Sequence, residues 1–251
     1  MRTGLFSLIL LSYHSGNRIP QVYHKLASGF QAEGIEFEFI IIDDGSTDDS
    51  YNIAKTLEAS SPKVQAYRLS RNYSSHYAIF AGLSVAKGDL VSMMPDDWQT
   101  PLEVYVQIYR EWQKGAQVII PFRSKRNDGI FNELFARSYY LLMNKLSDIS
   151  FPPLGADIFA VDREVADILN QRIHPINTSA LIEVMRLGFD PLYLPYERPS
   201  TKGHKSRWTF KKKLRLFKDT FYASSDFPIK LFSFVRGASF VLSFVVIVIS
   251  I

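Results

Sequence analysis

Two short acidic clusters follow apolar segments at different points of the chain. Asp43 and Asp44 come directly after the apolar run 37–42, and Asp96 and Asp97 come just after the run 90–94. In open α/β sheets, ligands bind in the crevice beyond the carboxyl ends of the strands, so both clusters can meet there. Such carboxylates can accept hydrogen bonds from a base or a ribose, and they can hold Mg²⁺ or Mn²⁺ together with substrate phosphates.

Each cluster also has a purely structural explanation. The Asp-Gly pair at 44–45 is typical of a β-turn, and Ser46 or Thr47 can cap the helix that follows. The second cluster can likewise be a turn between a strand and a helix. Taken one at a time, the clusters leave both interpretations open.

The elements that must position these residues are visible in the apolar pattern. Strand candidates are residues 5–11, 37–42, 64–69, 90–94, 118–121 and 158–161, and helix candidates are 18–31, 48–60, 75–86, 101–114, 132–146, 164–171 and 179–187. Thr100, Pro101 and Glu103 have the pattern of a capping box with proline at the first helical position. Alternating strands and helices, with strands apolar on both faces, predict a mostly parallel α/β sheet covered on both sides.

Composition and charge limit the possible functions. The 251 residues include no cysteine, which excludes disulfides, thiolate metal sites and a cysteine nucleophile. The net charge of +4 conceals a basic segment, 198–218, with nine Lys or Arg and no acidic residue. Because the rest of the chain is acidic on balance, this pattern argues against binding of nucleic acid and favours a specific anionic partner.

The end of the chain has the character of a membrane-associated segment. Residues 237–251 are apolar or small and carry no charge. A bilayer span needs about 20 apolar residues, so the run indicates a shortened transmembrane helix or a helix at the interface, with a buried strand as the alternative. Residues 211–222 predict a basic amphipathic helix, which either lies at a membrane surface or packs on the domain. We therefore expect three parts: a folded α/β domain at 1–208, a basic amphipathic helix at 209–230, and an apolar membrane-associated segment at 231–251.

Five motifs in a fixed order give the chain a more specific resemblance. They are DDGS at 43–46, LSRN at 69–72, PDDWQTP at 95–101, PPLGAD at 152–157 and GHKSRW at 203–208. In this order they resemble glycosyltransferase family 2, and within it the enzymes that glycosylate polyprenyl phosphates, such as dolichyl-phosphate mannose synthase. The resemblance extends over nearly the whole chain. It implies a Rossmann-like GT-A fold that binds a nucleoside-diphosphate sugar.

The resemblance also implies roles for individual residues. Asp97 matches the last Asp of the family's Asp-x-Asp motif, so it would act in catalysis by holding Mg²⁺ or Mn²⁺ on the diphosphate, with Asp96 as a second ligand. Asp157 matches the acidic residue near the acceptor, as its base or its orienter. The residues implied for the nucleotide sugar are Tyr13, Asp43, Asp44, Arg71 and Asp96, and those for the phosphates are Arg198, Lys205 and Arg207.

The chain departs from the family pattern at three places. Pro95 stands where the first Asp of the Asp-x-Asp motif is expected. After the first strand only Tyr13 remains of the usual Pro-x-Tyr-Asn-Glu, and Ala156 replaces a glycine before Asp157. These departures concern the identity of the donor and the dependence on metal more than they concern the fold.

Together these observations predict an inverting glycosyltransferase that moves a sugar from a UDP-sugar to a polyprenyl phosphate, for cell-surface glycan assembly. The expected place is the cytoplasmic face of the membrane, where the basic segment can meet anionic lipid. Two alternatives stay open: a saccharide hydroxyl as the acceptor, or a relative that binds the nucleotide sugar without catalysis. A homo-oligomer is also left open.

Overall fold

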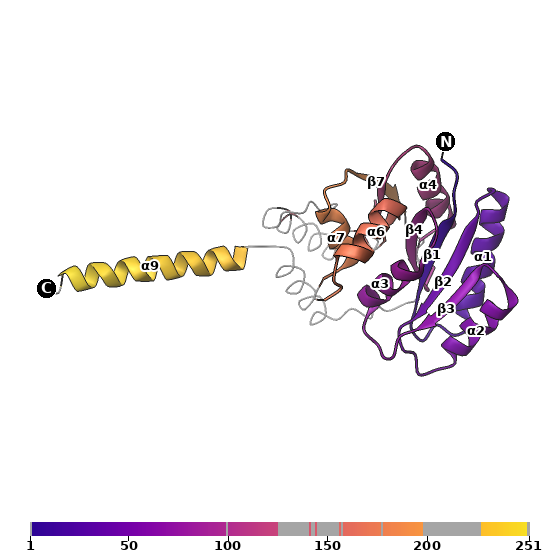
Figure 1. Cartoon of the computed structure of the whole chain (residues 1–251), viewed down its shortest axis with the longest axis horizontal. Helices are drawn as coiled ribbons and strands as arrows, with labels where there is room; N and C mark the ends of the chain where they lie inside the picture. Colours follow the sequence, from indigo (N-terminus) through magenta and orange to yellow (C-terminus); the bar gives the residue numbers. More distant parts are fainter. Residues whose placement is uncertain are drawn as a thin grey trace.

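The computed structural model describes residues 2–98, 100–124, 141, 144, 156, 158–176, 178–197 and 227–249. Within these residues seven strands form one sheet in the order β3-β2-β1-β4-β6-β5-β7. Helices lie on both sides of this sheet (Figure 1). The prediction of a mostly parallel α/β sheet with helices on both faces is confirmed.

The first half of the sheet is parallel. It consists of β1 (Phe6–Ser12), β2 (Phe37–Asp43), β3 (Val64–Arg68) and β4 (Leu90–Pro95). β1 lies between β2 and β4, and β2 also pairs with β3. Because helices cover both faces, every residue of β2 is buried, which explains why its sequence is apolar on both faces except at Glu38 and Asp43.

The second half of the sheet breaks the parallel pattern. It contains β5 (Val118–Arg123), β6 (Ala160–Asp162) and β7 (Pro191–Tyr196). β6 runs antiparallel to both β4 and β5, whereas β7 is parallel to β5. The strand predicted at 158–161 is therefore displaced to 160–162, and the apolar run at 192–195, which the sequence pattern leaves unassigned, forms an edge strand.

The helices follow the predicted alternation closely. They are α1 (Arg18–Ala32), α2 (Ser50–Ser60), α3 (Ser75–Val85), α4 (Leu102–Gln113), α6 (Arg163–Arg172) and α7 (Ala180–Arg186). The predicted capping box is wrong, because Pro101 is the N-cap of α4 and no side chain caps that end. Helix caps at Ser46 or Thr47 are also wrong, since α2 is preceded by Asp49. The helices predicted at 132–146 and 211–222 lie outside the described residues, apart from 141 and 144.

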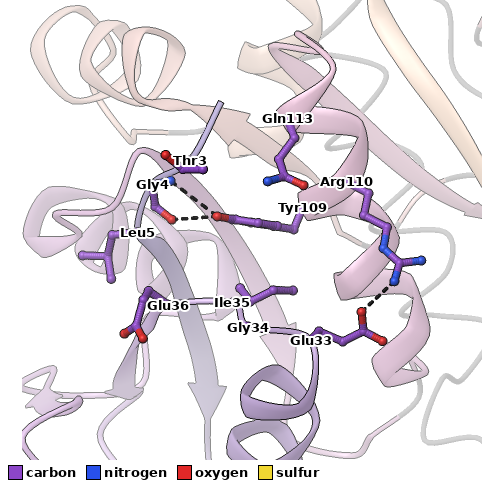
Figure 2. A pocket seen from close by; sticks show the side chains of 10 residues that line it. All are labelled: Thr3, Gly4, Leu5, Glu33, Gly34, Ile35, Glu36, Tyr109, Arg110 and Gln113. Carbon is purple, nitrogen blue, oxygen red and sulfur yellow. Dashed lines mark hydrogen bonds and ion pairs between the residues drawn. The ribbon is translucent and has the colours of Figure 1, made fainter. Parts of the chain in front are cut away.

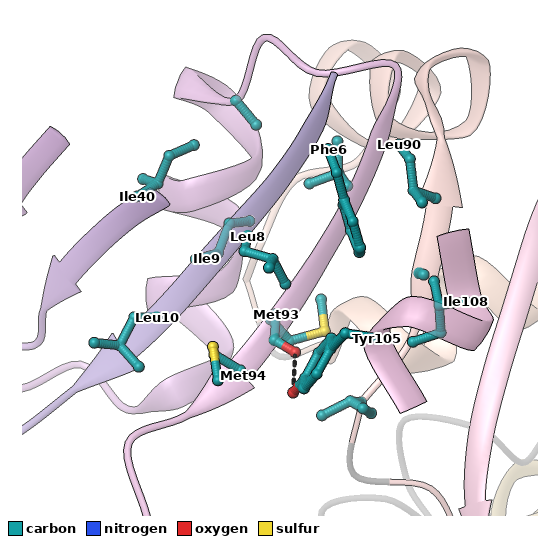
Figure 3. Close-up of a cluster of buried hydrophobic side chains, with 14 of the residues drawn as sticks. Phe6, Leu8, Ile9, Leu10, Ile40, Leu90, Met93, Met94, Tyr105 and Ile108 are labelled. Atoms are coloured by element: carbon teal, nitrogen blue, oxygen red, sulfur yellow. Dashed lines mark hydrogen bonds between the residues drawn. The ribbon is translucent and has the colours of Figure 1, made fainter. Parts of the chain in front are cut away.

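The core lies between the central strands and the helices that flank them. Figure 3 shows Phe6, Leu8 and Met93 from β1 and β4 against Tyr105 and Ile108 of α4. All five side chains are fully buried. The hydroxyl of Tyr105 donates to the carbonyl oxygen of Met93 at 3.4 Å, so the one polar atom of this ring has a partner. This packing fixes β1 and β4, whose carboxyl ends carry the residues of interest.

Helix α9 (Phe227–Ile249) contains most of the apolar tail. It projects away from the sheet in Figure 1, and large side chains such as Phe232, Phe234 and Phe240 are each more than 70% exposed. A helix, rather than the buried strand that was the alternative, is thus confirmed at the end of the chain, and its association with a membrane stays a prediction. No helix in the described part of the chain combines the length and the apolar character needed to cross a membrane.

A partly buried histidine in α3 gives the fold a testable pH dependence. Burial lowers the pKa of His76 below its usual value of 6.5, and Nδ1 has no hydrogen-bond partner among the described residues. The unfolded chain then binds the proton more readily, so the contribution of His76 to stability is complete above pH 6.5 and is lost as the pH falls below it.

We therefore expect His76→Gln to flatten the acid side of the stability curve, where one proton contributes a slope of up to about 1.4 kcal/mol per pH unit. Urea unfolding between pH 5 and pH 8, roughly spanning this window, measures the effect. The same change at the exposed His24 is the control. An unchanged slope in His76→Gln would mean that the pKa of this side chain is not lowered in the folded protein.

Candidate active site

The carboxyl ends of the four parallel strands β1 to β4 lie at the same end of the sheet. In the strand register Ser12 lies beside Asp43, Asp43 lies beside Arg68, and Leu11 lies beside Pro95. The segments that follow these strands therefore leave the sheet at neighbouring positions. This arrangement brings together both acidic clusters and the loop that carries Arg71, as the sequence predicts.

Asp43 is the buried end of this group. It has no solvent-exposed surface, and its carboxylate accepts hydrogen bonds from the backbone N–H of Ser46 at 3.0 Å and from its hydroxyl at 2.5 Å. The guanidinium of Arg68 lies 3.5 Å away and donates to the carbonyl oxygen of Ser46 at 2.6 Å. Asp43 thus shapes the turn after β2, and its charge is balanced by Arg68.

Asp44 connects the turn after β2 to the start of α3. Its two carboxylate oxygens accept hydrogen bonds from the backbone N–H groups of Tyr73, at 2.7 Å, and Ser74, at 2.9 Å. Burial raises the pKa of the Asp44 carboxyl, and the two backbone hydrogen bonds partly offset this effect. Each carboxylate oxygen has a second lone pair, so Asp44 can hold this loop and still accept a bond from a ligand.

Gly45 allows the loop at 69–72 to pack directly against this turn. Its φ of +68° lies in the left-handed region, and a Cβ at this position would come within 2.4 Å of the carbonyl carbon of Arg71. Only glycine satisfies both conditions without moving the loop. The DDGS motif therefore determines where Arg71 lies, in addition to supplying carboxylates.

Arg71 is exposed and lies next to an aromatic ring. Its guanidinium lies 4.6 Å from the centre of the Tyr73 ring. Hydrogen bonds from Ser70 and Arg71, together with the charge of Arg71, lower the pKa of the Tyr73 hydroxyl. The guanidinium group of an arginine is always charged and can donate two hydrogen bonds to one phosphate group. An exposed guanidinium that packs on an aromatic ring is therefore suited to binding phosphate.

Backbone strain is concentrated in the loops that follow the carboxyl ends of these strands. Among the described residues, the non-glycine residues with positive φ are His14, Ser74 and Trp98, which follow β1, β3 and β4. Ser74 is the most unusual, with φ +88° and ψ 163°, a conformation that is nearly restricted to glycine. The hydrogen bond from its N–H to Asp44 helps to hold it there. Strained residues of this kind tend to gather at functional sites.

The second acidic cluster forms the turn after β4. Asp96 turns toward α1, where its Oδ2 accepts from the hydroxyl of Ser15 and from the guanidinium of Arg18, the latter at 2.7 Å. Asp97 is exposed at the end of the strand. No group of three or more His, Cys, Asp or Glu able to hold a metal occurs in the described residues. One or two carboxylates completed by phosphate oxygens is nonetheless the usual way in which Mg²⁺ is bound, so the residues fit such an ion.

Tyr13 and several buried serine hydroxyls form the loop region after β1, at the same end of the sheet. Tyr13 is 45% exposed, and its ring stacks on that of His14 with 4.2 Å between centres. The hydroxyl of Ser46 accepts from the N–H of His14 at 3.0 Å, and that of Ser15 accepts from the N–H of Tyr13 at 3.1 Å. The loop after β1 is thereby fixed, with the ring of Tyr13 partly exposed at the carboxyl end of the sheet.

Sequence reasoning missed several residues of this network. Ser15, Arg18 and Arg68 make contacts with the acidic clusters that no motif indicates. The available signal is positional: Ser15 lies in the loop after β1, Arg18 begins α1, and Arg68 ends β3, all at the carboxyl end of the parallel strands. Of the predicted site residues, Asp157, Arg198, Lys205 and Arg207 lie outside the described residues.

A cavity of about 460 Å³ lies near the start of β1, at the end of the sheet opposite to the candidate site (Figure 2). The hydroxyl of Tyr109 donates to the carbonyl oxygen of Gly4 at 3.0 Å, and Arg110 pairs with Glu33 at 2.6 Å. These bonds tie α4 to the residues around β1 and to the end of α1. Because ligands of open α/β sheets bind at the carboxyl ends of the strands, this cavity is not part of the candidate site.

Comparison with known proteins agrees with the geometry. Residues 7–169 match the family model described as glycosyl transferase family 2. The bactoprenol glucosyl transferase of Shigella phage SfV is 27% identical over 231 residues, covering 91% of this chain and 75% of the relative. The undecaprenyl-phosphate 4-deoxy-4-formamido-L-arabinose transferase of Klebsiella pneumoniae is 25% identical over 239 residues, covering 95% and 73%.

A solved structure supports the fold. Glucosyl-3-phosphoglycerate synthase from Mycobacterium tuberculosis, in complex with Mn²⁺, UDP and glucosyl-3-phosphoglycerate, has a TM-score of 0.56 at 19% identity. The similarity covers 88% of this chain and 78% of that one. The predicted GT-A fold is confirmed. The family model matches more than half of the chain, and the protein therefore belongs to glycosyltransferase family 2.

Proposed function

We propose that this enzyme transfers a sugar from a nucleoside-diphosphate sugar, a UDP-sugar, to a polyprenyl phosphate, with inversion at the anomeric carbon. The observation that carries the proposal is the meeting of Asp43, Asp44, Arg71 and Asp97 at the carboxyl edge of β1–β4. The acceptor is inferred from the two relatives whose names specify bactoprenol and undecaprenyl phosphate.

The residues divide into those for the nucleoside and those for the diphosphate. Tyr13 offers a ring face to the base, and Asp43 and Asp44 shape the pocket, with the free lone pairs of Asp44 available to the nucleoside. Asp97, with Asp96 beside it, would hold Mg²⁺ or Mn²⁺. The ion supplies Lewis-acid stabilisation of the diphosphate leaving group.

Positive side chains act on the charge that develops as the anomeric C–O bond breaks. Arg71 lies in the described part of the site and can donate to a phosphate oxygen in a forked geometry. We assign Arg198, Lys205 and Arg207, from the basic loop, to the same task. Fixed donors of this kind lower the barrier most when they are aimed at charge that is present only in the transition state.

The acceptor oxygen attacks on the face opposite the leaving diphosphate, which accounts for the proposed inversion. A phosphate monoester has a second pKa of about 6, so a polyprenyl phosphate is already ionised near neutral pH and requires no strong base. A sugar hydroxyl would require one. Asp157 would therefore orient a lipid phosphate and would deprotonate a hydroxyl acceptor.

This difference gives a prediction for Asp157→Asn. With a lipid phosphate acceptor we expect kcat to fall by less than about 10-fold, whereas loss of a general base costs roughly 100- to 10,000-fold. Steady-state rates with a short-chain polyprenyl phosphate measure the effect, and a rate that rises with pH only in the wild type would identify a base. A loss of more than about 100-fold with the lipid acceptor would contradict the orienting role.

We further propose that the protein works at the cytoplasmic face of a membrane. The basic segment 198–218 can attract anionic head groups, at about 1 kcal/mol for each cation near the surface. The exposed apolar side chains of α9 can enter the head-group region. Both features would bring the site to a lipid-borne acceptor, and flotation with vesicles that contain anionic lipid tests the association.

The proposed reaction is tested by release of nucleoside diphosphate from a panel of UDP- and GDP-sugars, with Mg²⁺ or Mn²⁺, with and without polyprenyl phosphate. We expect release that requires a UDP-sugar, the metal and the lipid together. Release that requires a saccharide instead would replace the acceptor, and release only from GDP-sugars would replace the donor. The anomeric configuration of the product, determined by NMR, tests inversion.

A further inference from the structure

The hydroxyl of Ser15 joins the loop after β1 to the turn after β4. It donates a hydrogen bond to Oδ2 of Asp96, 81 residues away along the chain. It also accepts from the backbone N–H of Tyr13 at 3.1 Å and from the hydroxyl of Ser12 at 3.0 Å. Because Ser15 is only 3% exposed, these hydrogen bonds are shielded from water.

The direction of each of these bonds follows from the groups that make it. An ionised carboxylate only accepts and a backbone N–H only donates, so Ser15 gives its single proton to Asp96 and accepts from Tyr13. Its remaining lone pair accepts from Ser12. All the hydrogen-bonding capacity of the Ser15 hydroxyl is therefore used, which leaves the group one orientation.

The two segments that Ser15 joins belong to different halves of the proposed donor site. The loop after β1 carries Tyr13, which we assign to the nucleoside, and the turn after β4 carries Asp97, which we assign to the diphosphate. Pairing of β1 with β4 ends at Leu11 and Pro95. Beyond this pair the strand hydrogen bonds no longer set the separation of the two segments, so contacts between their side chains must do so.

The turn after β4 has two further contacts, both with α1. Arg18 lies 2.7 Å from Asp96, and the ammonium group of Lys25 lies 4.5 Å from the ring centre of Trp98. Arginine and lysine have long side chains with many rotamers, and 45% of the Arg18 side chain is exposed. Ser15 has one side-chain torsion and is buried, so it provides the stiffest of these three connections.

We propose that Ser15 is a positioning residue of the donor site, which holds the nucleoside loop and the diphosphate turn at a fixed separation. A nucleoside diphosphate spans both segments and gains from this preorganisation, because neither segment has to be ordered when the ligand binds. A nucleoside alone occupies one segment and does not sense the separation. The inference rests on the proposed function, because it treats the two segments as halves of one donor site.

The test compares the affinities of uridine and UDP for the full chain in buffer that contains Mg²⁺, by calorimetry for UDP and by ligand-detected NMR for uridine. We expect Ser15→Ala to weaken UDP binding about 10-fold, the effect of losing one hydrogen bond to a charged group. Uridine binding should weaken by less than about 3-fold, the lower end of the effect of a neutral hydrogen bond. Ser15→Thr keeps the hydroxyl and should recover most of the UDP affinity.

The matched control is Ser12→Ala, because Ser12 is equally buried and lies in the same network. This substitution leaves the bonds of Ser15 to Tyr13 and Asp96 in place, so UDP affinity should stay within about 3-fold of the wild type. If Ser15→Ala does not fold, Ser15→Cys provides the same comparison, since its thiol is similar in size but is a weak donor and a weak acceptor.

Equal losses of uridine and UDP affinity in the Ser15 variant, or no loss of either, would overturn the inference and leave the proposed function intact. A loss in Ser12→Ala as large as that in Ser15→Ala would also overturn it, because the link to Asp96 would then not be the cause. A wild type that binds neither uridine nor UDP would remove the donor site, and the proposed function would fail with it.

Discussion

Asp97→Asn is expected to lower turnover by roughly 100- to 1,000-fold, the loss typical of removing one fixed group that stabilises transition-state charge. The amide keeps the size of the side chain but is a poor ligand for a hard cation. Asp97 is exposed at the end of β4, so we expect the variant to remain folded. The measurement is kcat at saturating nucleotide sugar over a range of Mn²⁺ concentrations.

The matched control is Asp167→Asn, which removes an acid on α6 that pairs with Arg163 at 3.3 Å. It has the same chemical change on a helix away from the strand ends and should retain full activity. Higher Mn²⁺ concentrations should recover part of the activity of Asp97→Asn. Normal turnover of that variant at low Mn²⁺ would show that Asp97 is not the metal ligand.

Asp43→Ala is the second change with a large expected effect, and this effect is on folding. The substitution leaves the N–H and hydroxyl of Ser46 without their acceptor inside the protein and removes the carboxylate that pairs with Arg68. Buried donors that lose their acceptors cost about 1–3 kcal/mol each, so we expect a loss of roughly 2–5 kcal/mol in the free energy of unfolding. Chemical denaturation measures this, and calorimetry with UDP measures the accompanying loss of nucleotide affinity.

Asp43→Asn provides a graded comparison, because its amide oxygen can accept one of the two bonds from Ser46 while its NH₂ group cannot accept the other. We expect its stability to lie between those of the wild type and Asp43→Ala. The exposed Asp190 gives the control, Asp190→Ala, which should change stability by less than about 0.5 kcal/mol. Wild-type stability of Asp43→Ala would mean that the turn after β2 does not depend on this carboxylate.

The parallel half of the fold could be predicted because its strands are buried on both faces. A strand such as β2, in which every residue is buried, has a mostly apolar sequence that stands out against its surroundings. β6 could not be placed correctly, because three residues between two longer strands carry no pattern of their own. Its antiparallel direction depends on the path of the chain before it rather than on its composition.

The positions of the acidic clusters could be predicted, but their contacts could not. The two oxygens of Asp44 accept from the backbone of Tyr73 and Ser74, and backbone donors leave no trace in side-chain identity. The ion pair of Asp96 with Arg18 depends on where α1 lies relative to the turn after β4. A motif identifies residues that contact a ligand; it says little about the residues that hold them.

The three strained residues show the same limit. Ser74 and Trp98 are not residue types that favour positive φ, and histidine adopts it far less readily than glycine, so the sequence does not point to these conformations. Gly45 is the exception, since an Asp-Gly pair after a strand already predicts a tight turn. Its close approach to Arg71 depends on how the loop at 69–72 packs against the turn, which the sequence alone does not show.

The proposed reaction is transfer of a sugar from a UDP-sugar to a lipid phosphate. The most direct measurement is transfer of labelled sugar from a UDP-sugar to the organic-extractable phase, with the wild type and Asp97→Asn compared in the presence of Mn²⁺ and polyprenyl phosphate. We expect a labelled lipid product that requires both additions and is nearly absent with Asp97→Asn. Labelled product that forms equally well without the metal, or that forms only on a saccharide, would contradict it.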